Sequence, residues 1–234
     1  MLNFEEICKD FLRINLSTKK LEKFNTYYET LTFFKNKVNL TNITSKNEVY
    51  IKHFLDSLSL IKFVNLELYS KFLDIGTGAG FPGIPLAILY PKLHLTLIES
   101  KAKKVAFLKY LVHKLELSNV TIILGRAEVI GKDTSYREKY DLVLARAVAK
   151  LNILAEYCLP FVKVKGLFIA YKTKIEEVYE SKNAFLALGK ATFKTYSFSL
   201  PKGMGERLIV VVLKNSMTKT TYPRSTNAIL KKPL

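Results

Sequence analysis

The chain has 234 residues, of which 49% are hydrophobic and 12% are aromatic, enough to bury a sizeable core and to exclude wholesale disorder. The net charge of +17 favours a polyanionic partner such as nucleic acid, with a lysine-rich composition bias as the alternative. Short apolar runs, the absence of a secretory pattern and two scattered cysteines predict a cytoplasmic protein with no membrane contact and no metal site.

Residues 1–68 predict a helical N-terminal extension, because apolar side chains recur there at helical spacing without strand alternation. The Asn- and Thr-rich stretch within it is typical of a loop, since such side chains bond their own backbone. The predicted elements are a helix over residues 4–12, a second helix capped by Ser17 or Thr18, a loop at 39–44 and a third helix at 48–64.

From Lys71 onward, short apolar strands alternate with helices, which is typical of a parallel sheet covered on both faces. The last two strands are joined by a segment too short for a crossover, so we expect an antiparallel hairpin. We therefore predict a mostly parallel seven-stranded α/β sheet within residues 69–215, then a basic tail at 216–234 that is extended from residue 222. The predicted strands are 72–75, 95–99, 120–124, 142–145, 166–171, 192–198 and 207–213, and the helices are 84–90, 101–115, 151–160 and 175–188.

One segment carries a ligand-binding pattern: Asp74-Ile75-Gly76-Thr77-Gly78-Ala79-Gly80, between a strand and a helix. Its glycines permit positive φ and let a ligand lie against bare backbone, while the following helix offers unpaired N–H groups. A dinucleotide fingerprint needs its third glycine one residue later, where Phe81 stands. The spacing favours S-adenosylmethionine as the cofactor, with a dinucleotide or a ligand-free turn as alternatives.

Two acidic residues suit the polar ends of that cofactor. Asp74, directly before the glycines, would attract a methionine ammonium group and disfavour a pyrophosphate. Glu99 ends the next strand, where an acidic side chain suits a ribose diol. Together with Gly76 and Gly78 of the loop, these two residues are predicted to bind the cofactor.

The glycine loop is also one of several motifs in collinear order. Residues 73–86, Leu-Asp-Ile-Gly-Thr-Gly-Ala-Gly-Phe-Pro-Gly-Ile-Pro-Leu, resemble the signature of the RsmG (GidB) family, bacterial methyltransferases of small-subunit ribosomal RNA. The tail departs from the family pattern at Asn227 and Ile229, where the family has Gly and Pro. The resemblance runs from about residue 35 to the C-terminus and includes residues 39–43, 53–58, 99–108, 125–128, 140–141, 145–147 and 222–224.

The resemblance implies a Rossmann-like class I methyltransferase fold and methyl transfer from S-adenosylmethionine to N7 of a guanosine in 16S ribosomal RNA. The implied partner is 16S ribosomal RNA or the small ribosomal subunit. For Arg146, at the end of a strand, a surface ion pair with Asp141 is the alternative to a ligand contact. The family's cofactor contacts match Gly76 in the loop, Phe81 beside the methionine, Ala127 and Glu128 near the adenine, and Arg146.

The chemistry of guanine N7 predicts that no side chain acts as a catalytic acid or base. Its lone pair is available in the neutral base, so alignment of donor and acceptor is sufficient. His53 and Asp56 share a helix face, which favours a structural hydrogen bond over a substrate contact. We expect a monomer; the competing functions are methylation of a small molecule or protein, and non-catalytic RNA binding in ribosome assembly.

Overall fold

The computed structural model describes residues 3–34, 37–43 and 45–234. Seven strands form one sheet in the order β3-β2-β1-β4-β5-β7-β6. The first five pair in parallel, while β7 is antiparallel to both β5 and β6. The predicted sheet and hairpin are confirmed. The strands are β1 Lys71–Ile75, β2 His94–Glu99, β3 Val120–Leu124, β4 Tyr140–Arg146, β5 Val162–Lys172, β6 Thr192–Ser199 and β7 Glu206–Leu213.

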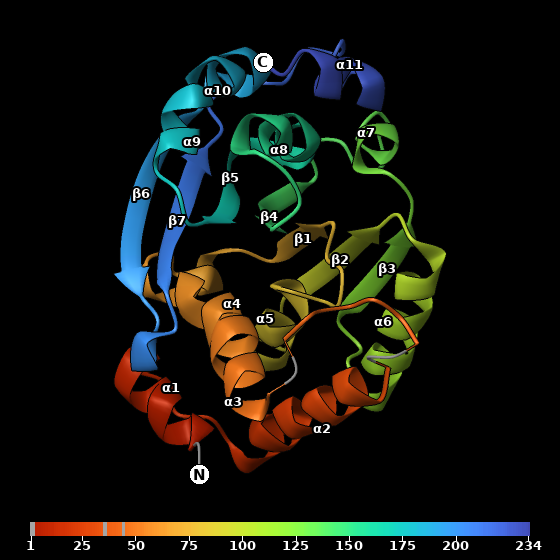
Figure 1. The fold of residues 1–234 in the computed structure, drawn as a ribbon. Helices are drawn as coiled ribbons and strands as arrows, with labels where there is room; N and C mark the ends of the chain where they lie inside the picture. Colours follow the sequence, from red (N-terminus) through yellow and green to blue (C-terminus); the bar gives the residue numbers. More distant parts are fainter. Residues whose placement is uncertain (1–2, 35–36, 44) are drawn as a thin grey trace.

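Helices cover both faces of the sheet (Figure 1). Alternate residues of one strand enter different cores: Leu142 and Leu144 pack with the N-terminal helices, whereas Val143 and Ala145 pack on the opposite face. This two-sided burial explains why the parallel strands are nearly continuous apolar runs. On the first face lie α2 Thr18–Phe34, α5 Gly83–Leu89 and α6 Ala102–Lys114; on the second lie α7 Ala127–Ile130, α8 Leu151–Cys158, α9 Glu176–Glu180, α10 Lys182–Gly189 and α11 Thr226–Lys231.

The N-terminal segment carries the predicted helices, joined by the non-helical residues 13–17 and 37–43; residues 1–2, 35–36 and Thr44 of the predicted loop lie outside the described residues. Helix α1 (Phe4–Leu12) is capped by Asn3, whose side chain accepts from the Glu6 N–H, and Ser17 accepts from the Lys20 N–H. The predicted third helix is a composite. It runs through α3 Lys46–Glu48, a π-helical stretch Val49–Leu55, α4 Asp56–Leu58 and 3₁₀ turns at Ser59–Lys62 and Leu66–Leu68.

Two predictions in the C-terminal half are wrong. The single helix expected at 175–188 is two helices, α9 and α10, which meet at Ser181. The tail expected to be extended from residue 222 contains α11, because Ser225 caps it by accepting from the Ala228 N–H and Ile229 is fully buried. The polar composition of the tail and its proline do not predict α11, because contacts with distant parts of the chain stabilise this short helix.

Across the described ranges, no helix is both long and apolar enough to cross a membrane. The two cysteines are buried and unpaired, and burial raises the pKa of the Cys8 thiol to about 12. They are part of the core, as their apolar surroundings in the sequence indicate.

Candidate functional site

The glycine loop follows β1 at the carboxyl edge of the sheet. Gly76 and Gly78 have φ of +65° and +61°, which a side chain rarely tolerates. The Gly76 N–H donates to the Ile98 carbonyl at 2.9 Å, so the loop turns against β2. A Cβ atom at Gly76 would lie 2.8 Å from Cγ2 of Val148, which closes over the loop from the end of β4. Both backbone conformation and space therefore require glycine here.

Asp74 lies beneath this loop and is fully buried. Its Oδ2 accepts from the Thr77 hydroxyl at 2.7 Å and from the Gly83 N–H at 2.9 Å. Its Oδ1 is buried and has no hydrogen-bond partner in the described part of the chain. Burial raises the pKa of this carboxyl to about 6. One carboxylate oxygen thus fixes the loop, and the other is left as an unpaired acceptor.

Glu99 also contacts the loop, from the end of β2. Its Oε2 accepts from the Gly78 N–H at 3.1 Å and its Oε1 from the Lys101 N–H at 2.9 Å. The side chain is only 5% exposed. Glu99, which the sequence predicts to bind a ribose, is therefore held in place by backbone N–H groups at the edge of the glycine loop.

A cavity of about 290 Å³ opens beside the loop, over the carboxyl ends of β1, β2 and β3. Of the predicted cofactor residues, Gly76, Ala127 and Glu128 line it, and Asp74 and Glu99 accept from backbone N–H groups at and after the loop. The predicted residues outside this lining are Asp74, Gly78, Phe81, Glu99 and Arg146. Its walls combine apolar side chains with a few polar groups, as is usual for small-molecule sites. The lining is Ile75, Gly76, Ile98, Ser100, Gly125, Arg126, Ala127, Glu128, Val148, Ala149, Tyr157, Thr226 and Leu230.

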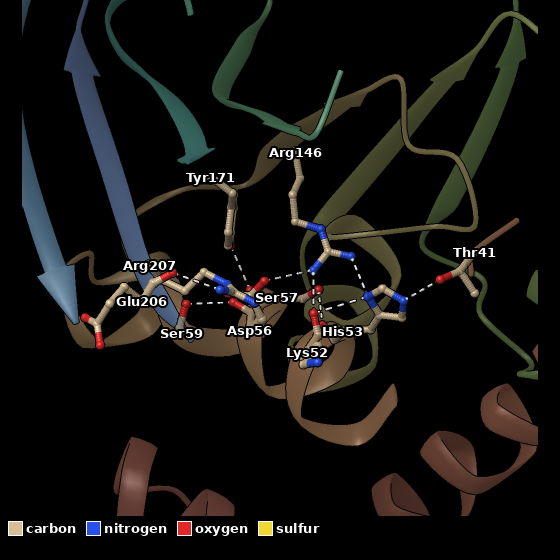
Figure 2. A network of polar contacts seen from close by, with 10 residues as sticks. All are labelled: Thr41, Lys52, His53, Asp56, Ser57, Ser59, Arg146, Tyr171, Glu206 and Arg207. Atoms are coloured by element: carbon tan, nitrogen blue, oxygen red, sulfur yellow. Dashed lines mark hydrogen bonds and ion pairs between the residues drawn. The ribbon is translucent and has the colours of Figure 1, made fainter. Parts of the chain in front are cut away.

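A second cavity, of about 350 Å³, lies on the other side of the β4 end. Figure 2 shows its polar floor, where Arg146 from β4 and Arg207 from β7 converge on Asp56 of α4. Arg146 Nη1 donates to Asp56 Oδ2 at 3.2 Å, and Arg207 Nε donates to Asp56 Oδ1 at 3.2 Å. The lining is Ile43, Lys52, His53, Asp56, Arg146, Ala147, Tyr171, Lys172, Thr173, Glu177 and Arg207.

His53 in this cavity is a neutral hydrogen-bonding residue. Its Nδ1 lies 3.3 Å from Arg146 Nη2, and its Nε2 lies 2.8 Å from the Thr41 hydroxyl. Nδ1 also lies 3.1 Å from the Lys52 carbonyl oxygen, and the Thr41 hydroxyl can donate to or accept from Nε2, so these contacts are compatible with either neutral tautomer. Burial, reinforced by the charge of Arg146, lowers the pKa of His53 to about 3.

Phe81 joins the glycine loop to the N-terminal helices. Its ring stacks on Tyr27 of α2, with centroids 5.2 Å apart, and on His53, with centroids 4.6 Å apart. The guanidinium carbon of Arg146 lies 4.9 Å from the Phe81 ring centroid, in a cation–π contact. Tyr27 also donates its hydroxyl to the Ala79 carbonyl at 2.6 Å. The N-terminal helices therefore brace the loop directly.

Two pairings considered from the sequence do not form. Arg146 does not pair with Asp141; that carboxylate bonds Lys163 and the Ser70 and Lys71 N–H groups at the other end of β4. Asp56 does not bond His53 among the described contacts, because both side chains bond Arg146. The ion pair of Arg207 with Asp56 is not predictable from the sequence, since nothing near Arg207 indicates that β7 inserts beside β5.

No group of three or more His, Cys, Asp or Glu side chains in the described ranges is arranged to hold a metal ion. The polar side chains of the two cavities are instead arginines, lysines, hydroxyl groups, one neutral histidine and the carboxylates of Asp56, Glu128 and Glu177. These groups suit the binding and orientation of organic ligands.

Comparison with known proteins gives a consistent match over the chain. The family described as rRNA small subunit methyltransferase G matches residues 20–205. A protein of Bacillus subtilis (strain 168) named ribosomal RNA small subunit methyltransferase G is 41% identical, over 100% of this chain and 99% of its own. One of the same name from Thermoanaerobacter pseudethanolicus is 47% identical over 92% of this chain and 90% of its own.

Solved structures share the fold at low sequence identity. A putative O-methyltransferase from Klebsiella pneumoniae superposes with a TM-score of 0.58 at 13% identity, over 91% of this chain and 96% of its own. An O-methyltransferase from Bacillus cereus, crystallised in complex with SAH, gives a TM-score of 0.57 at 16% identity over 89% and 96% of the two chains. These likenesses confirm the Rossmann-like class I methyltransferase fold.

Proposed function

The chain belongs to the rRNA small subunit methyltransferase G family, and we propose that it methylates N7 of a guanosine in 16S ribosomal RNA, using S-adenosylmethionine. Family membership makes it an S-adenosylmethionine-dependent methyltransferase of small-subunit ribosomal RNA. The choice of guanine N7, the residues of the site and the mechanism are the finer parts of the proposal. They are supported by the two cavities and their chemistry.

The residues around the smaller cavity fit S-adenosylmethionine. Oδ1 of Asp74 is a buried acceptor without a partner, which suits the ammonium group of the methionine. A Cβ at Gly76 would collide with Val148, another residue of the cavity lining, so this wall requires glycine. We assign Glu99 to the ribose and Ala127 with Glu128 to the adenine, as these residues follow β2 and β3 in turn.

The observation that carries the proposal is the pair of cavities on either side of the β4 end. Arg146 and Ala147 line the larger one, and Val148 and Ala149 line the smaller one. A donor held in one cavity and a base held in the other would meet across this short segment. Methyl transfer needs such a face-to-face arrangement, because nucleophile, methyl carbon and sulfur must lie in line.

We assign the larger cavity to the target guanine. The bound cofactor would supply an activated methyl group on a sulfonium, so the protein has only to align the base and exclude water. The neutral His53 and the Asp56 carboxylate held by two guanidiniums are poorly placed to remove a proton. Guanine N7 suits a cavity of this kind, since its lone pair needs no deprotonation.

Cationic side chains outnumber carboxylates in the lining of this cavity, which suits an RNA backbone. Arg146 and Arg207 share Asp56, and Lys172 pairs with Glu177. The cavity continues into an open groove of about 860 Å³ between α9 and the β6–β7 hairpin, with Thr173, Glu177 and Arg207 in both linings. Four glutamates line this groove against the three cations Lys150, Lys174 and Arg207, so we do not assign it to the RNA backbone. The target base would enter the larger cavity when it is turned out of the RNA. We further propose that the protein acts as a monomer in the cytoplasm, on ribosomal RNA or the small subunit.

Ribosomal RNA from cells that lack the protein provides the direct test. Small subunits and naked 16S RNA from these cells are incubated with the purified protein and labelled S-adenosylmethionine, and the modified nucleosides are mapped by mass. We expect one new N7-methylguanosine per 16S RNA. Label on another atom or base would refute the assignment of N7, and no label in either substrate would refute the proposed function.

Calorimetry separates this function from its alternatives. We expect binding of S-adenosylmethionine and none of NAD. RNA affinity should fall steeply with salt, because neutralised phosphates release counterions. Cofactor binding together with weak, salt-insensitive RNA binding would favour a small-molecule or protein methyltransferase.

A further inference from the structure

The C-terminal helix α11 forms one wall of the smaller cavity. Thr226 and Leu230, one helical turn apart, both line this cavity, beside Ala127 and Glu128 of α7. Figure 1 shows α11 lying next to α7 at the edge of the sheet. Leu230 is 56% exposed and gives this wall an accessible apolar surface.

The segment that carries α11 is built into the domain. Arg224 donates to the buried carboxylate of Glu156 from its backbone at 2.8 Å and from its side chain at 2.6 and 2.9 Å. Arg137 donates to the carbonyls of Thr218 and Tyr222 at 2.7 and 2.8 Å. Bidentate arginine pairs and carbonyl clamps of this kind fix geometry. The wall is therefore preorganised.

We propose that α11 closes the adenine end of the cofactor site and that Thr226 positions Glu128 to recognise the 6-amino group of adenine. The inference rests on the proposed function, since it takes S-adenosylmethionine as the ligand. The Thr226 hydroxyl donates to Oε1 of Glu128, a side chain that is 7% exposed. Oε1 also lies 3.6 Å from Arg126 Nη1, whereas Oε2 has no hydrogen bond among the described contacts.

This arrangement leaves Oε2 as the acceptor for the ligand. A carboxylate without Thr226 would be free to rotate toward Arg126, which is largely exposed. Held by Thr226, it presents an acceptor to an amino group and repels the carbonyl that hypoxanthine carries in the same place. Leu230 adds an apolar surface against which a purine ring can pack.

The experiment compares two ligands, S-adenosylhomocysteine and S-inosylhomocysteine, which differ at the 6-position of the purine. Calorimetry is performed on the full chain and on Thr226→Val, Thr226→Ser and Leu230→Ala. Asn227→Ala, an exposed residue on the same helix, is the matched control. Thermal melting shows whether each variant is folded.

We expect the unaltered protein to bind the adenosyl ligand at least about tenfold more tightly than the inosyl ligand, because the latter leaves a buried acceptor unpaired. Thr226→Val should lower the affinity for the adenosyl ligand about tenfold and bring the ratio of the two affinities closer to one. Thr226→Ser should restore this affinity and this ratio. Leu230→Ala should weaken the two ligands equally, and Asn227→Ala should change neither.

The outcomes distinguish the inference from its premise. If the unaltered protein binds neither ligand, the proposed function fails. If the unaltered protein binds the adenosyl ligand, and a folded Thr226→Val variant keeps the same affinity for it and the same ratio of adenosyl to inosyl affinity, the inference alone is overturned. An equal loss for both ligands in Thr226→Val would also overturn it, since a merely structural threonine would not move the ratio.

Discussion

The cavity assigned to the cofactor and the cavity assigned to the target base adjoin the same strand end, yet the chain assembles them differently. On the cofactor side, short segments follow successive parallel strands: the glycine loop after β1, Glu99 at the end of β2 and Ala127 after β3. On the target side, Asp56 from before the sheet holds Arg146 from its centre and Arg207 from its last inserted strand.

The two cavities therefore depend on different properties of the chain. The cofactor side depends on backbone conformation and close approach, which glycine spacing encodes locally. The target side depends on charge balance among distant segments, which only the completed fold provides. Variants on the two sides should therefore fail in different ways, the first in cofactor affinity and the second in turnover.

The largest effect is expected from Gly76→Val on the cofactor side. Its side chain would meet Val148 in a backbone conformation of φ +65°, so S-adenosylmethionine affinity should fall by more than about 100-fold. Calorimetry on protein shown to be folded by circular dichroism measures the loss. Retained affinity would show that the cofactor lies elsewhere.

Asp56→Asn, on the target side, should slow methylation and leave cofactor affinity nearly unchanged. It leaves two guanidiniums without their carboxylate, and we expect methylation to slow about 100-fold while S-adenosylmethionine affinity stays within about threefold. The free energy of unfolding should fall by about 3 kcal/mol, since a buried ion pair is broken. Single-turnover methylation and calorimetry give the two quantities.

Asp141→Asn is the matched control for this variant. Asp141 is 7% exposed and ion-paired with Lys163, but it lies at the opposite end of β4. It should lose stability without slowing the folded enzyme. If methylation slows equally in Asp56→Asn and Asp141→Asn, the effect of Asp56 is one of stability. The two cavities would then not differ in the way their variants fail.

A smaller effect is expected from pH on the cofactor side. Burial raises the pKa of Asp74 to about 6 from its usual 3.8, so the folded protein without cofactor is stabilised by this group below pH 3.8 and loses that contribution as pH rises through 6. An ammonium group prefers the ionised form. S-adenosylmethionine affinity should therefore fall, by up to about tenfold per pH unit, below pH 6.

Asp74→Asn should bind more weakly at pH 8 and lose this pH dependence. Calorimetry between pH 5 and pH 8 tests both expectations. An unchanged slope in Asp74→Asn would remove Asp74 from the ammonium site. His53 does not confuse the test, because its pKa of about 3 keeps it neutral throughout this range.

The sequence predicted the strands to within a few residues and the positive-φ turn of the glycine loop, because both depend on local pattern. It missed α11, whose stability comes from the distant Glu156 and from burial of Ile229. It offered Asp141 as the ion-pair alternative for Arg146, whereas the ion pair formed is with Asp56. Contacts between segments far apart in the chain need the sheet order, which no local pattern contains.

The smallest expected effect tests whether the N-terminal helices belong to the cofactor side. Tyr27→Phe keeps the stack on Phe81 but removes the hydrogen bond to the Ala79 carbonyl, leaving a buried acceptor unpaired at a cost of about 1–2 kcal/mol. We expect S-adenosylmethionine affinity to fall about threefold, because the cost is shared between loop position and overall stability. Tyr28→Phe, the neighbouring half-buried tyrosine, is the control. Calorimetry should find its affinity unchanged; an equal change in both variants would mean that α2 stabilises the fold without holding the loop.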